Sequence, residues 1–462
     1  MFKYILTVIC AYISTLLLVF IATFISIVLG IQWGSIPHKY LQAVLFIQKI
    51  FAKFHCIDSE KTSTTIERDQ SLCVLSRSQS AVSASDMQFQ FDINKENALS
   101  IFDVVNDFAS SGLQSIVQDD VSGLFSFSPA YVEYELTLPI LRQLNNDIKL
   151  HIFYMLTFGF RAFFLFPLRL LLLSSSFGFA AFWCLIVYFF SLTKQRKTWI
   201  AVTYCRLFCA GTGVIAKYHN EDKIPKQPGI AVSNHLSPND IQIICANVNP
   251  NRDYLYTVTG QKHTGIIWVI ESLVERINKS IWFDRGKAND RQLFIEQIMD
   301  EGRRAGPVLL FPEGYCTNNT HVLQFRKAVF TDDVTIYPIA IKQDARFGDS
   351  FWSEDLFYNY LIRLLTSWAA VYDIYYLDPQ QKKSDETSDE FATRIQLLIA
   401  NAIEKPAALF DGSVWYKPAE RQKYRNALQL KCAWEVSSLM PPTSDAKRKD
   451  ENEHKKVTFG FT

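Results

Sequence analysis

Residues 229–240 read GIAVSNHLSPND, and this stretch decides the fold. Its first five residues form a short apolar run, which is typical of a strand buried on both faces of a sheet. The run ends at Asn234 and His235, and a helical pattern (DIQIICAN) begins at Asp240. A strand, a polar turn and a helix in immediate succession form one unit of an α/β fold.

The same alternation of strand and helix continues to about residue 378. Amphipathic stretches predict helices at about 264–278 and at 289–306. Apolar runs predict further strands at 254–260, 280–285, 307–311, 335–341 and 370–377. We therefore expect an α/β fold with a mostly parallel sheet flanked by helices, and functional groups at the strand ends.

Two apolar regions precede this pattern. Residues 4–31 contain no charged side chain and are long enough to cross a bilayer. The apolar part of a cleaved signal peptide has only about 7–15 residues, so we interpret residues 1–34 as an uncleaved membrane anchor. A second apolar region, 151–193, contains Arg161 and Arg169. It fits either one span with a basic entry or a re-entrant hairpin.

Basic residues follow both apolar regions. Because positive flanks favour the cytosolic side, this distribution favours the hairpin. The sequons beginning at Asn278 and Asn318 would be glycosylated only if they were luminal. The basic residues are Lys39, Lys49 and Lys53 after the first region, and Lys194, Arg196 and Lys197 after the second.

The remaining composition is less specific. Residues 35–150 are predicted to be a polar loop followed by a helical region, 194–415 the catalytic domain, and 416–462 a region with a disordered polar tail. A net charge of +1 gives no reason to expect a nucleic-acid partner. The nine cysteines show no paired or zinc-binding spacing, which suits a reducing compartment and predicts no metal.

The spacing of His235 and Asp240 has two interpretations. Ser237 can cap a helix that starts at Pro238, and Asp240 then completes a capping box without any catalytic role. Alternatively, Asp240 holds the imidazole of His235 so that the other ring nitrogen accepts a proton. The spacing alone favours the capping box.

Further strings accompany this pair in a fixed order. They are Ile281-Trp282-Phe283-Asp284-Arg285, Phe311-Pro312-Glu313-Gly314 and Ile336-Tyr337-Pro338-Ile339-Ala340. With Asn234-His235-x4-Asp240 they resemble the NHxxxxD, FxxR, FPEG and apolar-Pro-apolar motifs of the glycerolipid acyltransferases. Residues 316–319, 341–352 and 364–377 further resemble the microsomal glycerol-3-phosphate acyltransferases. The resemblance covers about residues 90–415.

The resemblance implies an acyl-CoA-dependent enzyme that converts glycerol-3-phosphate to 1-acyl-glycerol-3-phosphate, the first step of phospholipid and triacylglycerol synthesis. His235 would be the general base on the acceptor hydroxyl, and Asp240 would orient the imidazole. Attack on the thioester would be direct, with acyl-CoA as co-substrate and without a cofactor. The resemblance also implies a place in the endoplasmic reticulum membrane, with the catalytic domain in the cytosol.

Three substrate-binding roles follow from the same motifs. Arg285 would bind the phosphate, because a guanidinium binds phosphate in a bidentate manner, although a surface arginine at a strand end is the alternative. Glu313 and Gly314 match the motif that lines the acceptor site. Gly314 is equally consistent with a plain turn.

The loop after the FPEG string and the fourth motif complete the expected site. Asn318 and Asn319 would bind acceptor hydroxyls or shape the loop, and Pro338 would form the acyl-CoA wall. Many relatives have Thr where this chain has Tyr315, which leaves substrate placement open. Lysophosphatidate acyltransferases commonly have Arg where this chain has Cys316, and this difference favours glycerol-3-phosphate as the acceptor.

Three alternatives remain at this point. The acceptor could be lysophosphatidate or another lysophospholipid. Cys316 could be a nucleophile, but no neighbour in the sequence would activate its thiol. A membrane lipid-binding scaffold without activity is disfavoured because His235, Asp240, Arg285 and Glu313 occur together. The sequence does not determine the oligomeric state.

Overall fold

The computed structural model describes residues 2–50, 121–134, 148–262, 272, 275–283 and 290–427, apart from 32, 122, 227, 253, 254, 355, 418, 421 and 425. The chain forms two units, one of residues 1–76 and 122–412 and one of 77–121 and 413–462. In the second unit the structure describes the short helix α15 (Ser413–Tyr416). Most of the predicted polar loop and helical region at 35–150, most of the polar tail, most of the predicted helix at 264–278 and Arg285 lie outside the described residues.

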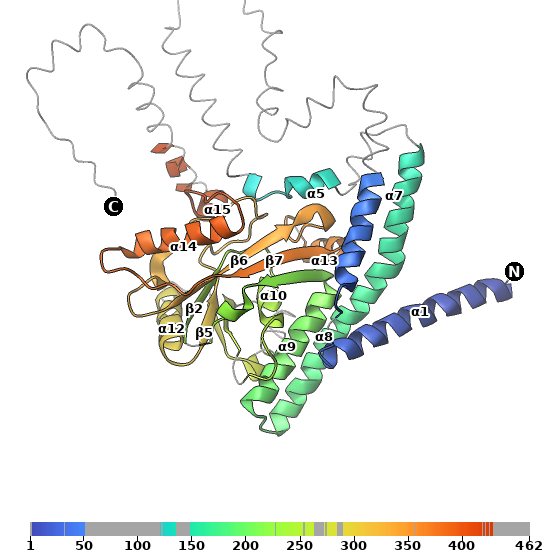
Figure 1. Ribbon diagram of the computed structural model, residues 1–462, viewed down its shortest axis with the longest axis horizontal. Helices are drawn as coiled ribbons and strands as arrows, with labels where there is room; N and C mark the ends of the chain where they lie inside the picture. The colour runs from blue at the N-terminus through green and yellow to red at the C-terminus, as the bar shows by residue number, and fades with distance from the viewer. Residues whose placement is uncertain are drawn as a thin grey trace, which may run out of the picture. The chain divides into compact units, whose positions relative to one another are not determined.

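The first unit contains a seven-stranded sheet with the order β1-β7-β6-β2-β5-β3-β4 (Figure 1). Only the β6–β7 pair is antiparallel, so the mostly parallel α/β sheet is as predicted. The strands are β1 (Val214–His219), β2 (Gly229–Ser233), β3 (Thr257–Gln261), β4 (Ser280–Phe283), β5 (Pro307–Leu310), β6 (Ile336–Asp344) and β7 (Ala370–Tyr376). The sequence did not predict β1, because Lys217 and His219 interrupt its apolar pattern.

Alternate strand residues face two separate cores, one on each face of the sheet. In β2, Ala231 joins the core formed with α9, α10 and α13, whereas Ile230 and Val232 join the core formed with α12 and α14. The fully buried strand explains the continuous apolar run in the sequence. The helices are α9 (Lys194–Gly211), α10 (Asp240–Ala246), α12 (Asp290–Arg304), α13 (Phe357–Thr366) and α14 (Ser388–Ala402).

Within the described part of the chain, two helices are long and apolar enough to cross a membrane. The first is α1 (Phe2–Val28), most of whose side chains are exposed. The second consists of α7 (Ile148–Phe160), a π-helical segment (Arg161–Leu165) and α8 (Phe166–Phe189), which Figure 1 shows as one rod. This helix has no turn, so the hairpin favoured by the flanking charges does not agree with the structure.

Short elements complete the described chain. A helix at residues 36–50 follows α1, and α5 (Pro129–Tyr134) precedes the long rod. The 3₁₀ turns are η2 (Glu221–Lys223), η3 (Lys327–Val329) and η4 (Ala345–Phe347).

Two arginines attach the long helix to the rest of the first unit, which contains the sheet and is called the catalytic unit below. Nη1 of Arg169 donates to the carbonyls of Leu365 and Ser367 at 2.9 and 2.6 Å, and Nη2 donates to that of Trp368 at 2.6 Å. These carbonyls lie at the C-terminal end of α13, where backbone acceptors lack helical partners and a positive charge is favourable. Arg161 lies over the Trp368 ring, 5.2 Å from its centroid. Both arginines are buried, so they dock the helix on the protein and do not mark a basic entry into the membrane.

Candidate active site

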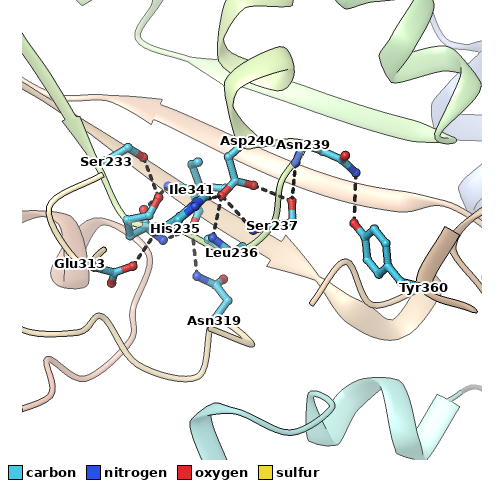
Figure 2. A network of polar contacts seen from close by, with 11 residues as sticks. Ser233, His235, Leu236, Ser237, Asn239, Asp240, Glu313, Asn319, Ile341 and Tyr360 are labelled. Carbon is cyan, nitrogen blue, oxygen red and sulfur yellow. Dashed lines mark hydrogen bonds and ion pairs between the residues drawn. The ribbon is translucent and has the colours of Figure 1, made fainter. Parts of the chain in front are cut away.

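The site lies at the carboxyl ends of the central parallel strands. His235 follows the end of β2, and Glu313 follows the end of the neighbouring strand β5. Adjacent parallel strands end at the same edge of a sheet, which is where α/β folds collect functional groups. Figure 2 shows His235 between Asp240 and Glu313 at this edge.

Asp240 is a fully buried carboxylate that accepts hydrogen bonds on both oxygens. Its Oδ2 accepts from the backbone N–H groups of Leu236 at 2.6 Å and Ser237 at 3.0 Å. Its Oδ1 accepts from the Ser237 hydroxyl at 2.8 Å. The helix α10 begins at Asp240, two residues after the predicted start at Pro238, but the predicted capping contacts are present, because the Ser237 hydroxyl accepts from the N–H of Asn239 at 3.3 Å and Asp240 accepts from the N–H of Ser237. The Ser237 hydroxyl binds the carboxylate, and the polar turn therefore extends to Asn239.

The imidazole of His235 is oriented by this carboxylate. Its Nδ1 lies 2.8 Å from Oδ2 of Asp240, which assigns the Nδ1 proton to this hydrogen bond and leaves Nε2 for proton transfer. The ring stacks on Phe311 with a centroid distance of 4.3 Å, and 21% of the side chain is exposed. The structure thus contains the contact between His235 and Asp240 that the oriented-base interpretation requires.

Electrostatics around His235 favour the charged imidazolium. Burial lowers the pKa of His235, but Cys316 and the Asp240 carboxylate raise it by more, and the pKa lies well above the ordinary 6.5. The Cys316 side chain therefore lies close to the ring. This neighbour of the thiol was not visible in the sequence, because His235 is distant along the chain.

Glu313 connects three segments through its buried carboxylate. Oε2 accepts from the backbone N–H of His235 at 2.6 Å, and Oε1 accepts from that of Leu323 at 2.8 Å. Burial raises the pKa of Glu313 to about 8, against the opposing effect of these two N–H groups. Both oxygens therefore hold the backbone that carries the base.

The asparagines of the site also bind backbone groups. Asn234 pairs with both the N–H and the carbonyl of Ile341, at 2.8 and 2.9 Å. Asn319 donates to the same carbonyl at 3.1 Å and accepts from the N–H of Gln343 at 2.9 Å. The amide nitrogen of Asn318 donates to two carbonyls of residues 123–126, at 2.6 and 3.0 Å. These contacts shape the loop, and binding of acceptor hydroxyls by Asn318 and Asn319 stays a prediction.

The other predicted residues have different surroundings. Gly314 has φ +70°, a left-handed conformation that favours glycine, as expected for a turn. Pro338 is buried within β6, opposite Val232, and no contact tests its assignment to an acyl-CoA wall. The phosphate role of Arg285 likewise stays a prediction, because this residue is outside the described part of the chain.

Sequence reasoning missed four residues that touch this site. Ser237 and Phe311 contact Asp240 and His235, and Leu323 binds Glu313. Phe311 lay within the FPEG string, so its position beside the histidine could have been anticipated. Arg326 lies in none of the four motifs, but its guanidinium lies over the Tyr315 ring, 5.5 Å from the centroid.

Comparisons with known proteins show what the chain is similar to. The acyltransferase family model matches residues 215–342, which include His235, Asp240 and Glu313. A solved structure, the 1-acyl-sn-glycerophosphate acyltransferase PlsC of Thermotoga maritima, covers 54% of this chain and 93% of its own, with 15% identity and a TM-score of 0.38.

Curated relatives extend the similarity over most of the chain. Glycerol-3-phosphate acyltransferase 3 of Xenopus laevis is 33% identical over 73% of this chain and 76% of its own length. Glycerol-3-phosphate acyltransferase 4 of Homo sapiens is 30% identical over 87% and 88%, respectively. Glycerol-3-phosphate acyltransferase 3 of Danio rerio is 34% identical over 64% and 66%. The oriented His–Asp pair and this extent of similarity together show that the chain is an enzyme of the glycerol-3-phosphate acyltransferase 3 and 4 family.

Proposed function

We propose that this enzyme transfers an acyl group from acyl-CoA to the sn-1 hydroxyl of glycerol-3-phosphate. The observation that carries the proposal is the 2.8 Å contact between His235 Nδ1 and the buried Asp240 carboxylate. It leaves one ring nitrogen for the acceptor hydroxyl, which is the arrangement that general-base catalysis needs. The names of the curated relatives support glycerol-3-phosphate as the acceptor.

The reaction then proceeds without a covalent enzyme intermediate. Nε2 of His235 removes the hydroxyl proton while the oxygen attacks the thioester carbonyl, and Asp240 stabilises the imidazolium. The tetrahedral intermediate collapses as the C–S bond breaks, and the imidazolium returns the proton to the CoA sulfur. The products are 1-acyl-glycerol-3-phosphate and CoA. In this scheme Arg285 binds the acceptor phosphate, Pro338 borders the acyl-CoA, and Glu313, Gly314, Asn318 and Asn319 define the acceptor side.

Membrane placement belongs to the same proposal. The exposed apolar surface of α1 supports an anchor in the bilayer, and the product is an amphiphile that enters the membrane directly. We place the enzyme in the endoplasmic reticulum membrane with the catalytic domain in the cytosol, which agrees with its free cysteines.

The decisive experiment is transfer of labelled palmitate from palmitoyl-CoA in membranes that contain this chain. Glycerol-3-phosphate and lysophosphatidate serve as parallel acceptors. We expect activity with glycerol-3-phosphate alone, and a loss of about 10²–10⁴-fold in the His235→Ala variant. Transfer only to lysophosphatidate would overturn the acceptor, and unchanged activity of His235→Ala would overturn the mechanism.

The contact between Cys316 and His235 favours one second candidate. A thiol beside an Asp-oriented imidazole could accept the acyl group first and form an acyl-enzyme thioester. The Cys316→Ala variant separates the two routes in the same assay. Direct transfer predicts retained activity and no labelled enzyme, whereas an acyl-enzyme route predicts loss of transfer.

A further inference from the structure

The loop after β5 needs a cation that its own sequence does not supply. A phosphate monoester acceptor, which the proposed function requires, carries two negative charges that need positively charged partners. Residues 311–325 contain neither Lys nor Arg. The first arginine along this loop is Arg326, and the structure returns its side chain to the start of the loop.

Arg326 approaches the loop at Gly314. Its backbone N–H donates to the carbonyl of Pro312 at 3.2 Å, which brings residue 326 back to the FPEG turn. Its Cζ and Nη1 lie 3.2 Å from the point where a Cβ on Gly314 would stand. Glycine is therefore favoured at position 314 for two reasons. It adopts the φ of +70° without strain, and it has no side chain that would displace the guanidinium.

Tyr315 provides the surface on which the guanidinium rests. Cζ of Arg326 lies 5.5 Å from the ring centroid, within the range of a cation–π contact. The ring is itself held, because a Cβ added to Gly412 would lie only 2.2 Å from its Cδ2. The departure from Thr at this position thus creates a support for the arginine.

The guanidinium keeps its hydrogen-bonding capacity. Its acidic neighbour is Asp411, whose Oδ2 lies 3.8 Å from Nε, which is too far for a hydrogen bond. Among the residues that the structure describes, the guanidinium makes no hydrogen bond, and 37% of the side chain is exposed. A preorientated arginine with available donors matches the requirements of bidentate phosphate binding.

The same loop holds the general base. Phe311 stacks on His235 at 4.3 Å, and the N–H of Thr317 donates to the His235 carbonyl at 3.0 Å. Arg326 contacts the loop between these two points. We propose that Arg326, supported by Tyr315, binds the phosphate of the acceptor as a second cation beside Arg285 and so presents the acceptor hydroxyl to His235. This inference rests on the proposed function.

Steady-state kinetics of the full-length enzyme provide the first test. Arg326→Ala should raise KM for glycerol-3-phosphate about 10- to 100-fold, as expected for a lost hydrogen bond to a charged group, and leave KM for palmitoyl-CoA unchanged. Arg326→Lys should recover part of the loss. Tyr315→Leu should raise the same KM by a smaller factor, whereas Tyr315→Phe keeps the ring and should not.

The adjacent cation is a matched control. Lys327 is 63% exposed and its Nζ pairs with Asp389 at 2.8 Å, away from the loop. Lys327→Ala should leave both KM values unchanged. An unchanged KM for glycerol-3-phosphate in Arg326→Ala, or equal rises for both substrates, would overturn the inference.

Equilibrium binding separates this inference from the proposed function. Calorimetry of the purified full-length chain should show tighter binding of glycerol-3-phosphate than of glycerol, and Arg326→Ala should reduce this difference. If the wild type binds glycerol-3-phosphate but transfers no acyl group to it, the proposed function fails and the phosphate contact stands. If the wild type binds neither compound, both are overturned.

Discussion

At the residue scale, Asp240 combines the two roles that its sequence spacing suggested, the capping contact and the orientation of the imidazole. One oxygen binds the Ser237 hydroxyl, and the other binds two backbone N–H groups together with the imidazole of His235. Both oxygens of this fully buried carboxylate therefore have hydrogen-bond donors, as a buried polar group requires. The polar turn after β2 therefore binds the Asp240 carboxylate, and this carboxylate orients the imidazole of His235.

The pH dependence of transfer should report this contact. The base acts in its neutral form, so activity should rise as the pH rises through the pKa of His235. Since the Asp240 carboxylate raises that pKa, Asp240→Asn should move the rising limb to lower pH and reduce the maximal rate by about 100-fold or more. Measurement of kcat/KM from about pH 5 to 9 checks both effects.

A second His–Asp pair serves as the control for this profile. His219 Nε2 lies 2.7 Å from Asp373 at the β1–β7 edge of the sheet. Asp373→Asn should leave the profile unchanged. If the rising part of the kcat/KM profile lies at the same pH in Asp240→Asn as in the wild type, a group other than His235 controls the pH dependence.

Single residues also show where sequence reasoning reaches its limit. His235 and Asp240 were found because both lie in one turn. The roles of Glu313 were hidden because its partners, the N–H groups of His235 and Leu323, lie 78 and 10 positions away. Arg326 was missed for the same reason, since only the folded loop brings it to Gly314.

At the element scale, strands β2 to β7 were predictable, whereas β1 and the course of the long helix were not. A strand such as β2 is apolar throughout because both of its faces are buried, and this pattern is visible in the sequence. In contrast, the apolar residues of 148–189 serve two surfaces, one exposed and one packed on the protein. Counting flanking charges could not reveal that Arg169 binds the end of α13.

Loss of this contact should destabilise the enzyme. Arg169→Met would leave the carbonyls of Ser367 and Trp368 without their donors, at a cost of about 1–3 kcal/mol each. Gly213→Ala should act in the same direction, because Gly213 has φ +72° and a Cβ would lie 2.5 Å from the Arg169 guanidinium. The midpoint of thermal inactivation in detergent measures both.

Gly178, which lies in the same helix as Arg169, is the matched control. No atom lies within 4 Å of a Cβ added to Gly178, so Gly178→Ala should be neutral or stabilising by about 0.5–1 kcal/mol. Equal midpoints for Gly213→Ala and Gly178→Ala would contradict the proposed importance of the Arg169 contact.

At the scale of the whole molecule, both ends of the long helix connect to one folded body. On the preceding side, the N–H of Ser128 donates to Asp349 at 2.7 Å, and the N–H of Asn318 donates to the carbonyl of Leu124 at 3.0 Å. On the following side, the chain continues into α9 and the sheet. A helix that crossed a bilayer would separate these two sides.

The sequence between α5 and the long helix is too short and too polar for the chain to cross the bilayer a second time. Residues 135–147 include Glu135, Arg142 and Asp147, whereas a span needs about 20 mainly apolar residues. The helix at 36–50 is also attached to the catalytic unit, since the Tyr40 hydroxyl donates to the carbonyl of Trp368 at 2.7 Å. We therefore expect residues 148–189 to lie along the membrane surface, with α1 as the crossing helix.

Engineered glycosylation sequons test this arrangement. Glu60→Asn and Asp385→Asn each create a sequon, one before and one after the long helix. Both should stay unmodified in cells, while a sequon fused ahead of Met1 should be glycosylated, as judged by a mobility shift that endoglycosidase removes. Modification of only one of the two internal sequons would show that the helix crosses. The native sequons are unsuitable reporters, because the amide nitrogens of Asn278 and Asn318 are bound within the fold.

The attachment of the long helix to the catalytic unit has a consequence for the growth of the membrane. An enzyme whose apolar rod stays on one side takes up acyl chains from that side and releases its product there. Every turnover would then add lipid area to a single leaflet. Balanced expansion of the bilayer would then depend on transbilayer movement of lipids.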